Sequence, residues 1–225
     1  MKIKLSSYKG IIFDLDDTLI DRKKAFKKVF TKLYMENKNI NKDTSLDQAL
    51  NFFSTLSPNN HIDIKKAFTK IKFKFKDFDK NYNSFYEFYY ENIVDLIEPY
   101  DGIKEFLLCM KEKQINFGVV TNGDDYQYKK IKNTGLDGLF NFVIASEIFG
   151  YSKPDIEIYE EALRQLKLTT KDIENVLFIG DNPYTDILGA KNIGFKTAWK
   201  KMDFEYPKDL SPPDYVIESY KDLEI

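Results

Sequence analysis

Residues 10–21 read "GIIFDLDDTLID", a short apolar run that passes directly into acidic residues. The apolar residues 11–13 predict a strand buried on both faces, because a half-buried strand would alternate apolar and polar side chains. The run ends in three carboxylates within four residues, Asp14, Asp16 and Asp17. A buried strand that leads into this much negative charge indicates a site where another group neutralises it.

The composition is that of an ordinary globular protein. The chain has 225 residues, enough for one substantial core and a smaller second unit. Hydrophobic residues make up 43% of the chain and charged residues 31%. Lys and Arg total 34 against 36 Asp and Glu, so the formal net charge of −2 gives no electrostatic basis for binding nucleic acid or a membrane.

Cysteine and histidine are nearly absent, which excludes several kinds of site. Cys109 is the only cysteine, so an intramolecular disulfide is impossible and a cytoplasmic location is favoured. Residues 1–10 lack the apolar core of a signal peptide, and no run approaches transmembrane length. His61 is the only histidine and follows the polar "SPNN". A surface position is preferred for it over a catalytic triad or a zinc site.

Short apolar runs alternate with helical patterns along the second half of the chain. The runs are 115–120, 140–145 and 176–180 and, more briefly, 196–199 and 214–217. Helical patterns follow Asp124 and Pro154. This alternation predicts a parallel sheet covered by helices on both faces.

Residues 22–97 predict helices instead. Residues fall at helical spacing in two stripes. The first comprises Ile64, Phe68, Ile71, Phe75 and Phe78, and the second comprises Phe85, Phe88, Tyr89, Asn92 and Leu96. The segment "IKFKFK" at 71–76 also alternates like a strand, but the first stripe continues beyond it, so a helix is favoured. An amphipathic helix with a lysine-rich, solvent-exposed face explains residues 65–80 better than nucleic-acid binding does.

The predicted fold is therefore α/β, with a Rossmann-like parallel sheet core and an inserted all-α cap domain. The core is expected at residues 1–20 and 98–225, and the cap at 21–97. In open parallel sheets, ligands bind beyond the carboxyl ends of the strands.

Polar residues follow four of the predicted strands. They are Asp14 and Asp16, Thr121 and Asn122, Lys153, and Asp181 and Asp186. Two carboxylates ~4 Å apart repel by about 4 kcal/mol at an effective dielectric near 20, so such a cluster needs protons or a cation. Oxygen ligands alone favour Mg²⁺, and Lys153 suits an anionic substrate.

Four motifs in order resemble those of the haloacid dehalogenase (HAD) superfamily of phosphotransferases: "DLDDT", "VVTNG", "SKPD" and "GDNPYTD". The resemblance covers about residues 9–20 and 99–220. The insertion at 22–97 matches the position of the family's helical cap but carries no motif. The resemblance implies a HAD-like core and Mg²⁺-dependent phosphoryl transfer.

Catalytic and metal-binding roles follow from this resemblance. Asp14 would be the nucleophile that forms an aspartyl phosphate, and Asp16 the general acid and base. Asp14, the backbone carbonyl of Asp16 and Asp181 would hold Mg²⁺. Asp186 would assist directly or through water.

The resemblance also implies a set of phosphate-binding groups. Thr121 and Lys153 would bind phosphoryl oxygens with their side chains. Exposed N–H groups following Asp14 and Thr121, those of Leu15, Asp16 and Asn122, would add backbone donors.

Purely structural roles remain open for several of these residues. Asp17 is preferred as a turn residue. Asp186 could be an acid at the start of a helix, Thr121 could cap a turn, and Lys153 could be a solvated loop residue. Their coincidence at four strand ends favours the catalytic interpretation.

Asp16 favours a phosphatase over a dehalogenase, because a halide leaves without a proton whereas an alkoxide needs one. The motif set resembles relatives that dephosphorylate nucleoside monophosphates, with stacking of a base on cap aromatics as an option. A sugar-phosphate phosphatase, a phosphomutase and a non-catalytic metal-binding or regulatory module remain alternatives. The expected partner is a small phosphorylated metabolite, and the chain is expected as a monomer or homodimer.

Overall fold

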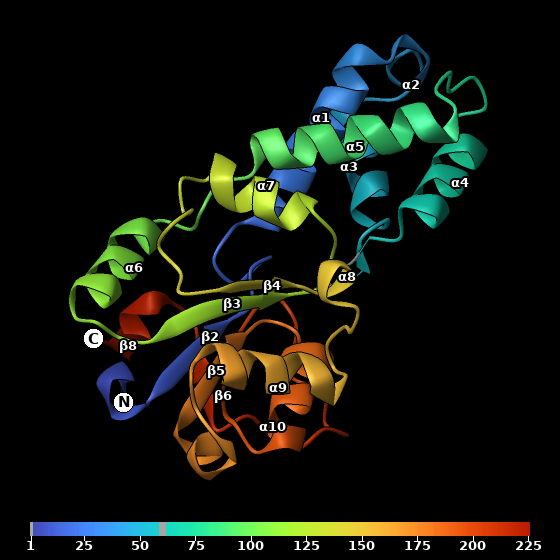
Figure 1. Cartoon of the computed structure of the whole chain (residues 1–225). Helices are drawn as coiled ribbons and strands as arrows, with labels where there is room; N and C mark the ends of the chain where they lie inside the picture. The colour runs from blue at the N-terminus through green and yellow to red at the C-terminus, as the bar shows by residue number, and fades with distance from the viewer. Residues whose placement is uncertain (1, 59–61) are drawn as a thin grey trace. The chain divides into compact units, whose positions relative to one another are not determined.

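The computed structural model describes residues 2–58 and 62–225, and the chain divides into two units (Figure 1). One unit comprises Met1–Ile20 and Pro99–Ile225, and the other comprises Asp21–Glu98. The helical unit therefore ends at Glu98, one residue after the end at residue 97 that the sequence predicted. His61, expected at the surface, lies outside the described residues.

A six-stranded parallel sheet forms the first unit, with strand order β4-β3-β2-β5-β6-β7. The strands are β2 (Gly10–Phe13), β3 (Phe117–Thr121), β4 (Val143–Ala145), β5 (Val176–Gly180), β6 (Lys196–Lys200) and β7 (Tyr215–Ile217). β2 lies at the centre, where Ile11 pairs with Phe117 on one side and Leu177 on the other. Its four residues are all buried, which explains the uninterrupted apolar run and confirms the predicted parallel sheet.

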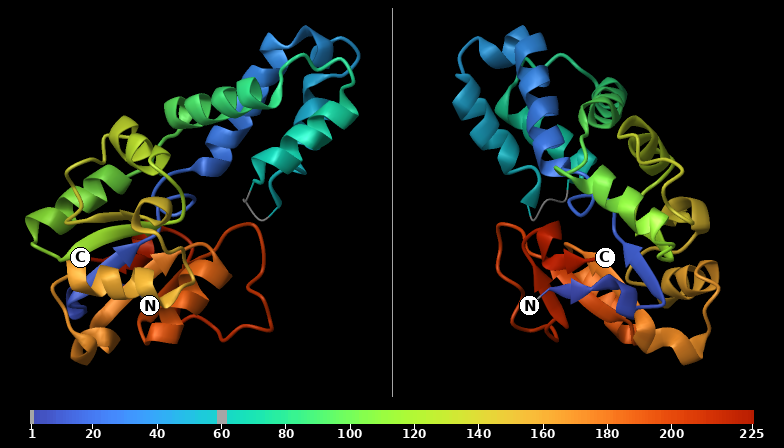
Figure 2. Two further views of the ribbon diagram at one scale, coloured as in Figure 1. Left: turned by 45° about the vertical axis from the view of Figure 1, so that its right-hand side comes forward. Right: turned by 90° about the vertical axis from the view of Figure 1, so that its left-hand side faces the viewer.

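Helices cover both faces of this sheet (Figures 1 and 2). On one side lie α6 (Ile103–Glu112) and α7 (Tyr126–Asn133), and on the other lie α9 (Ile156–Gln165) and α10 (Gly189–Ile193). Alternate strand residues such as Ile12 and Phe178 join one apolar cluster with Ile158 and Tyr159 of α9. The short helix α8 (Ser146–Phe149) follows β4, and a helical turn Thr170–Asn175 precedes β5.

A small second sheet joins the two ends of the chain. β1 (Ile3–Lys4) pairs in parallel with β8 (Leu223–Glu224), so these segments from the beginning and the end of the chain lie side by side. Each strand has only two residues, too few to produce a periodic signal in the sequence.

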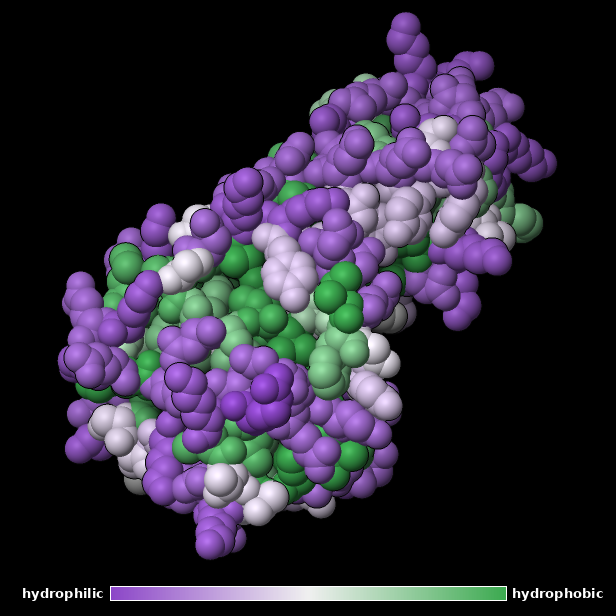
Figure 3. All heavy atoms as spheres, in the orientation of Figure 1, coloured by the Kyte–Doolittle hydropathy of each residue, from purple (hydrophilic) through white to green (hydrophobic). Residues whose placement is uncertain are grey.

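The second unit is entirely helical in its described residues. It contains α1 (Arg22–Glu36), α2 (Lys38–Asn41), α3 (Leu46–Ser54), α4 (Ile64–Lys74) and α5 (Tyr82–Leu96). Its core is aromatic: the Phe30 ring packs on Phe53, Phe85 and Tyr89. Hydrophilic residues dominate the face of this unit seen in Figure 3. None of the described helices has the length and apolar character needed to cross a membrane.

The predicted stripe from Ile64 to Phe78 needs one correction. The segment is helical through the first part of "IKFKFK", as favoured, but α4 ends at Lys74. Phe75 and Phe78 are buried in the following turn, whose end is marked by the Asn81 cap of α5. A turn that buries apolar side chains continues the helical spacing by coincidence.

The two chain segments that connect the units to each other are paired. Ile20 and Pro99 form an antiparallel bridge at the edge of the first unit. At the edge of the second unit the Asp21 N–H donates to the Glu98 carbonyl at 2.8 Å.

Candidate active site

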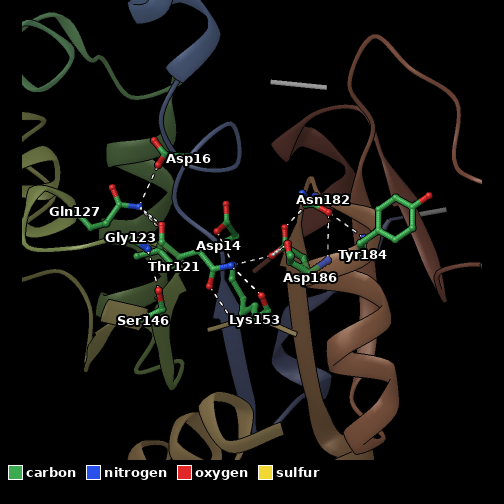
Figure 4. A network of polar contacts seen from close by, with 12 residues as sticks. Asp14, Asp16, Thr121, Gly123, Gln127, Ser146, Lys153, Asn182, Tyr184 and Asp186 are labelled. Carbon is green, nitrogen blue, oxygen red and sulfur yellow. Dashed lines mark hydrogen bonds and ion pairs between the residues drawn. The ribbon is translucent and has the colours of Figure 1, made fainter. Parts of the chain in front are cut away.

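The carboxyl ends of β2, β3 and β5 meet at one edge of the sheet (Figure 4). Asp14 follows β2, Thr121 ends β3, and Asp181 follows β5. The register fixes their proximity, because Phe13 pairs with both Val119 and Ile179. The sheet therefore brings together side chains from three distant parts of the sequence.

Lys153 lies at the centre of this group. Its Nζ donates to Oδ1 of Asp14 and to Oδ1 of Asp186, each at 2.7 Å. The Lys153 side chain is only 2% exposed, so a solvated loop position is wrong. Burial alone would lower the pKa of Lys153, but the charges of Asp14 and Asp186 outweigh it and raise that pKa, which keeps the group an ammonium.

The Asn122 side chain fixes the backbone of Lys153. The Lys153 N–H donates to Oδ1 of Asn122 at 2.8 Å, and Nδ2 of Asn122 donates to the Lys153 carbonyl at 2.9 Å. Both ends of the amide are therefore used to hold this loop against the end of β3. A phosphate-binding role for the Asn122 backbone N–H stays a prediction.

Three buried carboxylates lie close enough to share a metal ion. One oxygen from each of Asp14, Asp181 and Asp186 lies within 4.8 Å of the others. Burial, opposed by Lys153 and reinforced by the charges of Asp186 and Asp16, raises the pKa of Asp14 to about 7. One ammonium balances only one of the three negative charges, and the donor atoms are all hard oxygens. The residues present therefore fit a divalent cation such as Mg²⁺.

Asp186 owes its position to a tight local structure. It lies in a π-helical turn, Pro183–Leu188, where its Oδ2 accepts from the Asn182 N–H at 2.9 Å. A Cβ on Gly180 would lie 2.4 Å from this oxygen, so the end of β5 needs a glycine there. Asp186 does lie near the start of a helical segment, and it also faces the other carboxylates.

Thr121 accepts a hydrogen bond from Gln127, a residue for which the sequence predicted no role. Nε2 of Gln127 donates to Oγ1 of Thr121 at 2.6 Å and to the Asn122 carbonyl at 2.9 Å. Thr121 is only 1% exposed. Since Gln127 supplies the hydrogen in this bond, the Thr121 hydroxyl keeps its own hydrogen for another acceptor.

Asp16 turns toward α7 and not toward Lys153 (Figure 4). Nζ of Lys130 lies 2.9 and 2.7 Å from the two carboxylate oxygens, and Nε2 of Gln127 lies 3.1 Å from Oδ2. The sequence did not predict a role for Lys130 either, because "YQYKKIK" has the composition of a solvent-exposed helix face. The spacing of Gln127 and Lys130, three residues apart on one helix face, is the only signal the sequence offered.

The loop that carries Asp16 closes in a turn. Asp17 has a φ of 59°, a left-handed conformation that aspartate tolerates, in line with the turn role expected for it. Leu15, which precedes Asp16, is fully buried, and its carbonyl accepts from the Leu19 N–H at 2.9 Å. Phosphate binding by the N–H groups of Leu15 and Asp16 stays a prediction.

Comparison with known proteins identifies a family and several similar proteins. Residues 11–200 match the haloacid dehalogenase-like hydrolase family. Glyceraldehyde 3-phosphate phosphatase of Pyrococcus furiosus is 29% identical over 96% of this chain and 91% of the relative. Pyrophosphatase PpaX of Listeria innocua is 31% identical over 95% of this chain and 93% of the relative.

Solved structures show the same fold. The HAD hydrolase YfnB of Bacillus subtilis, crystallised with magnesium, superposes with a TM-score of 0.71 at 22% identity and covers 96% of both chains. The match to the family spans most of the chain, and phosphatases are among the curated relatives. The family and enzyme class predicted from the four motifs are confirmed: the chain belongs to the haloacid dehalogenase-like hydrolases, as a phosphatase of that superfamily.

Proposed function

We propose that this protein is a Mg²⁺-dependent phosphatase that hydrolyses a small phosphomonoester through an aspartyl-phosphate intermediate. One observation carries the proposal. The buried Lys153 ammonium bridges Asp14 and Asp186 while Asp181 completes a group of three carboxylates. A buried cluster of this kind is costly for folding, and binding a cation and a phosphate would offset that cost.

The phosphoryl group would bind between Thr121 and Lys153. Thr121 has a hydroxyl hydrogen to donate, because Gln127 donates to its oxygen. Lys153 supplies a third N–H beyond the two used on Asp14 and Asp186. The backbone N–H groups of Leu15, Asp16 and Asn122 are the further donors we assign to this site.

The reaction would proceed in two transfers. An Asp14 carboxylate oxygen forms a bond to phosphorus, the bond to the leaving oxygen breaks, and Asp16 gives that oxygen a proton. A water oxygen then bonds to phosphorus and loses a proton to Asp16, while the phosphorus–oxygen bond to Asp14 breaks. Inorganic phosphate and the free alcohol are the products, and both acids return to their starting state.

Asp14, the Asp16 carbonyl and Asp181 would hold the Mg²⁺. Both oxygens of Asp186 already accept hydrogen bonds, from Lys153 and from the Asn182 N–H, which favours its contact with the ion through water. The bound ion would supply charge balance for the cluster and for the oxygens of the phosphoryl group. Lys153 holds Asp14 in a fixed position for attack.

For the substrate we favour a small sugar-type phosphate over the nucleoside monophosphates that the motif pattern suggested. The relatives that support this choice are named glyceraldehyde 3-phosphate phosphatases, in Pyrococcus furiosus and Methanocaldococcus jannaschii. Pyrophosphate is the second candidate, supported by the PpaX relatives, which match 95% of this chain at 30–31% identity. We propose that residues 21–98 act as the cap that selects among such substrates.

A panel assay of phosphate release tests the proposal. The panel holds glyceraldehyde 3-phosphate, hexose phosphates, nucleoside 5′-monophosphates and pyrophosphate, each with Mg²⁺ and with a chelator. Asp14→Asn tests the nucleophile, and Asp137→Asn serves as a matched control at an exposed aspartate of the same unit.

Release that needs both Mg²⁺ and Asp14 is the expected result, with the triose phosphate as the best substrate. A preference for a nucleotide or for pyrophosphate would overturn the substrate choice but not the phosphatase. No release from any compound by a folded, Mg²⁺-binding protein would overturn the phosphatase itself.

A further inference from the structure

Asp16 is held by a buried lysine that the reaction described above does not use. Lys130 extends from α7 with its side chain 9% exposed, and its Nζ contacts both oxygens of the Asp16 carboxylate. The Asp16 side chain is itself only 17% exposed. A buried ammonium paired to a single carboxylate is an expensive arrangement, and losing either partner would leave an uncompensated charge.

Gln127 limits where this carboxylate can lie. Its Nε2 is within hydrogen-bond distance of Thr121 Oγ1, the Asn122 carbonyl and Asp16 Oδ2, at 2.6, 2.9 and 3.1 Å. An amide nitrogen carries two hydrogens, so three acceptors compete for two bonds. The contact to Asp16 is the longest of the three, which makes Lys130 the stronger hold on Asp16.

The same contacts place Asp16 beside the phosphate-binding hydroxyl. Thr121 and Asp16 share one donor nitrogen, so their oxygens are close neighbours, as Figure 4 shows. A leaving oxygen on a phosphorus bound by Thr121 would lie on this side of the site. An ammonium is a compact donor with three rotatable N–H groups, so it can donate to one Asp16 oxygen while the other oxygen carries the proton toward the leaving group.

We propose that Lys130 is a positioning residue for Asp16, and that it holds the carboxylate next to the leaving group of the substrate. This inference rests on the proposed phosphatase function. Lys130 does not touch the phosphoryl group, and it acts only through Asp16. Its loss should therefore matter most where the leaving group needs a proton.

The test compares two substrates in Lys130→Met. Glyceraldehyde 3-phosphate has an alkoxide leaving group that needs the proton of Asp16, whereas p-nitrophenolate leaves without one. Water attack in the second transfer also uses Asp16, so the comparison is made in kcat/KM, which reports only the steps up to release of the leaving group. We expect kcat/KM to fall about 10- to 100-fold with the first substrate and less than about threefold with the second. Lys130→Arg, which can hold a carboxylate with two parallel bonds, should restore most of the loss.

Two further variants complete the design. Lys129→Met removes the neighbouring lysine of the same helix, which is 51% exposed and paired with Asp125, and should change neither rate. In an Asp16→Ala background, adding Lys130→Met should cause no further loss, because the residue through which Lys130 acts is gone.

Each outcome decides the inference. An equal fall with both substrates, or a further loss in the Asp16→Ala background, would show that Lys130 acts on the fold or on phosphate, and would overturn it. Unchanged kinetics in Lys130→Met would overturn it as well. If Lys130→Met does not fold, Lys130→Gln, which keeps a donor without the charge, carries the same comparison. Failure of the proposed function itself is distinct, since the unmodified protein would then release no phosphate.

Discussion

The two units bury different kinds of side chain. Among the described residues, the buried charged groups all belong to the sheet unit: Asp14, Asp17, Lys130, Lys153, Asp181, Asp186 and Lys200. The buried polar residues of the helical unit are Asn37 and Asn92, and each hydrogen-bonds within that unit. The sheet unit thus carries the cost of buried charge, whereas the core of the helical unit is built from aromatic rings.

Replacing the nucleophile should give the largest effect and should separate function from stability. Asp14→Asn is expected to lower phosphate release at least about 10⁴-fold, since the covalent step is lost. The same change removes one of three crowded carboxylates, so the unfolding temperature without Mg²⁺ should rise. Activity assays and thermal unfolding in chelator check both, with Asp137→Asn as control. A lower unfolding temperature would contradict the view that this cluster destabilises the fold.

Phe30→Ala should affect the helical unit first. Phe30 is fully buried among aromatic rings, so its truncation should cost about 3–5 kcal/mol of unfolding free energy. Trp199 is the only tryptophan and lies in the sheet unit, so its fluorescence reports that unit, while circular dichroism reports all helices. We expect the dichroism transition to shift more than the fluorescence transition.

The control for that experiment is Phe73→Ala, because Phe73 is 87% exposed and its loss should be nearly neutral. Equal shifts of both signals in Phe30→Ala would mean that the two units unfold together. The stability of the helical unit would then not be separable from that of the sheet unit.

Mg²⁺ should stabilise the sheet unit selectively. At a free concentration 100 times its dissociation constant, a ligand specific for the folded state adds about 2.7 kcal/mol. The Trp199 transition should therefore move to higher temperature with Mg²⁺ and return with chelator. Asp181→Asn should abolish most of this shift. A shift of equal size in that variant would move the metal site away from these carboxylates.

Removing a surface ion pair should have the smallest effect on stability, and each unit contains one such pair that can be tested. Hydrogen bonds from Lys24 and Lys28 lower the pKa of Glu98 to about 2, and a hydrogen bond from Lys9, with those of Thr169, lowers the pKa of Asp172 to about 2. Each lowered pKa adds stability above the ordinary carboxyl range that is lost as the pH falls toward 2.

Glu98→Gln and Asp172→Asn should therefore each lower the unfolding temperature slightly at pH 7 and not at all near pH 2. Thermal unfolding across that range, with the unmodified protein alongside, measures the difference. A difference that persists unchanged at the acid end would show that the ion pair is not its source.

The sequence predicted the elements whose burial is uniform. β2 and β5 are apolar throughout and follow their runs closely, and the acids and hydroxyl after the strands converge as expected. The end of α4 was missed because Phe75, buried in a turn, continues the spacing of the helix. Periodicity records which side chains are buried, not whether the backbone between them is helical.

The missed parts of the site have a different cause. Gln127 and Lys130 lie on a helix with two other lysines, and no local pattern separates a buried lysine from a solvated one. Their burial depends on Asp16, which is far away in the sequence. The side chain of Asn122 likewise holds Lys153, which lies 31 residues further along the chain. Pairings between distant segments are set by the fold as a whole.

The paired connections between the units bear on how the chain folds. β2 must find β3 across the whole inserted segment, since Ile11 pairs with Phe117. Closing a loop of roughly 100 residues costs about 2 kcal/mol more in chain entropy than closing one of roughly ten. The Asp21 N–H bond to the Glu98 carbonyl brings the ends of the insert together once it has folded. We therefore expect the helical unit to act as a tether during folding: if it forms first, the central strands of the sheet search for each other over a much shorter effective distance.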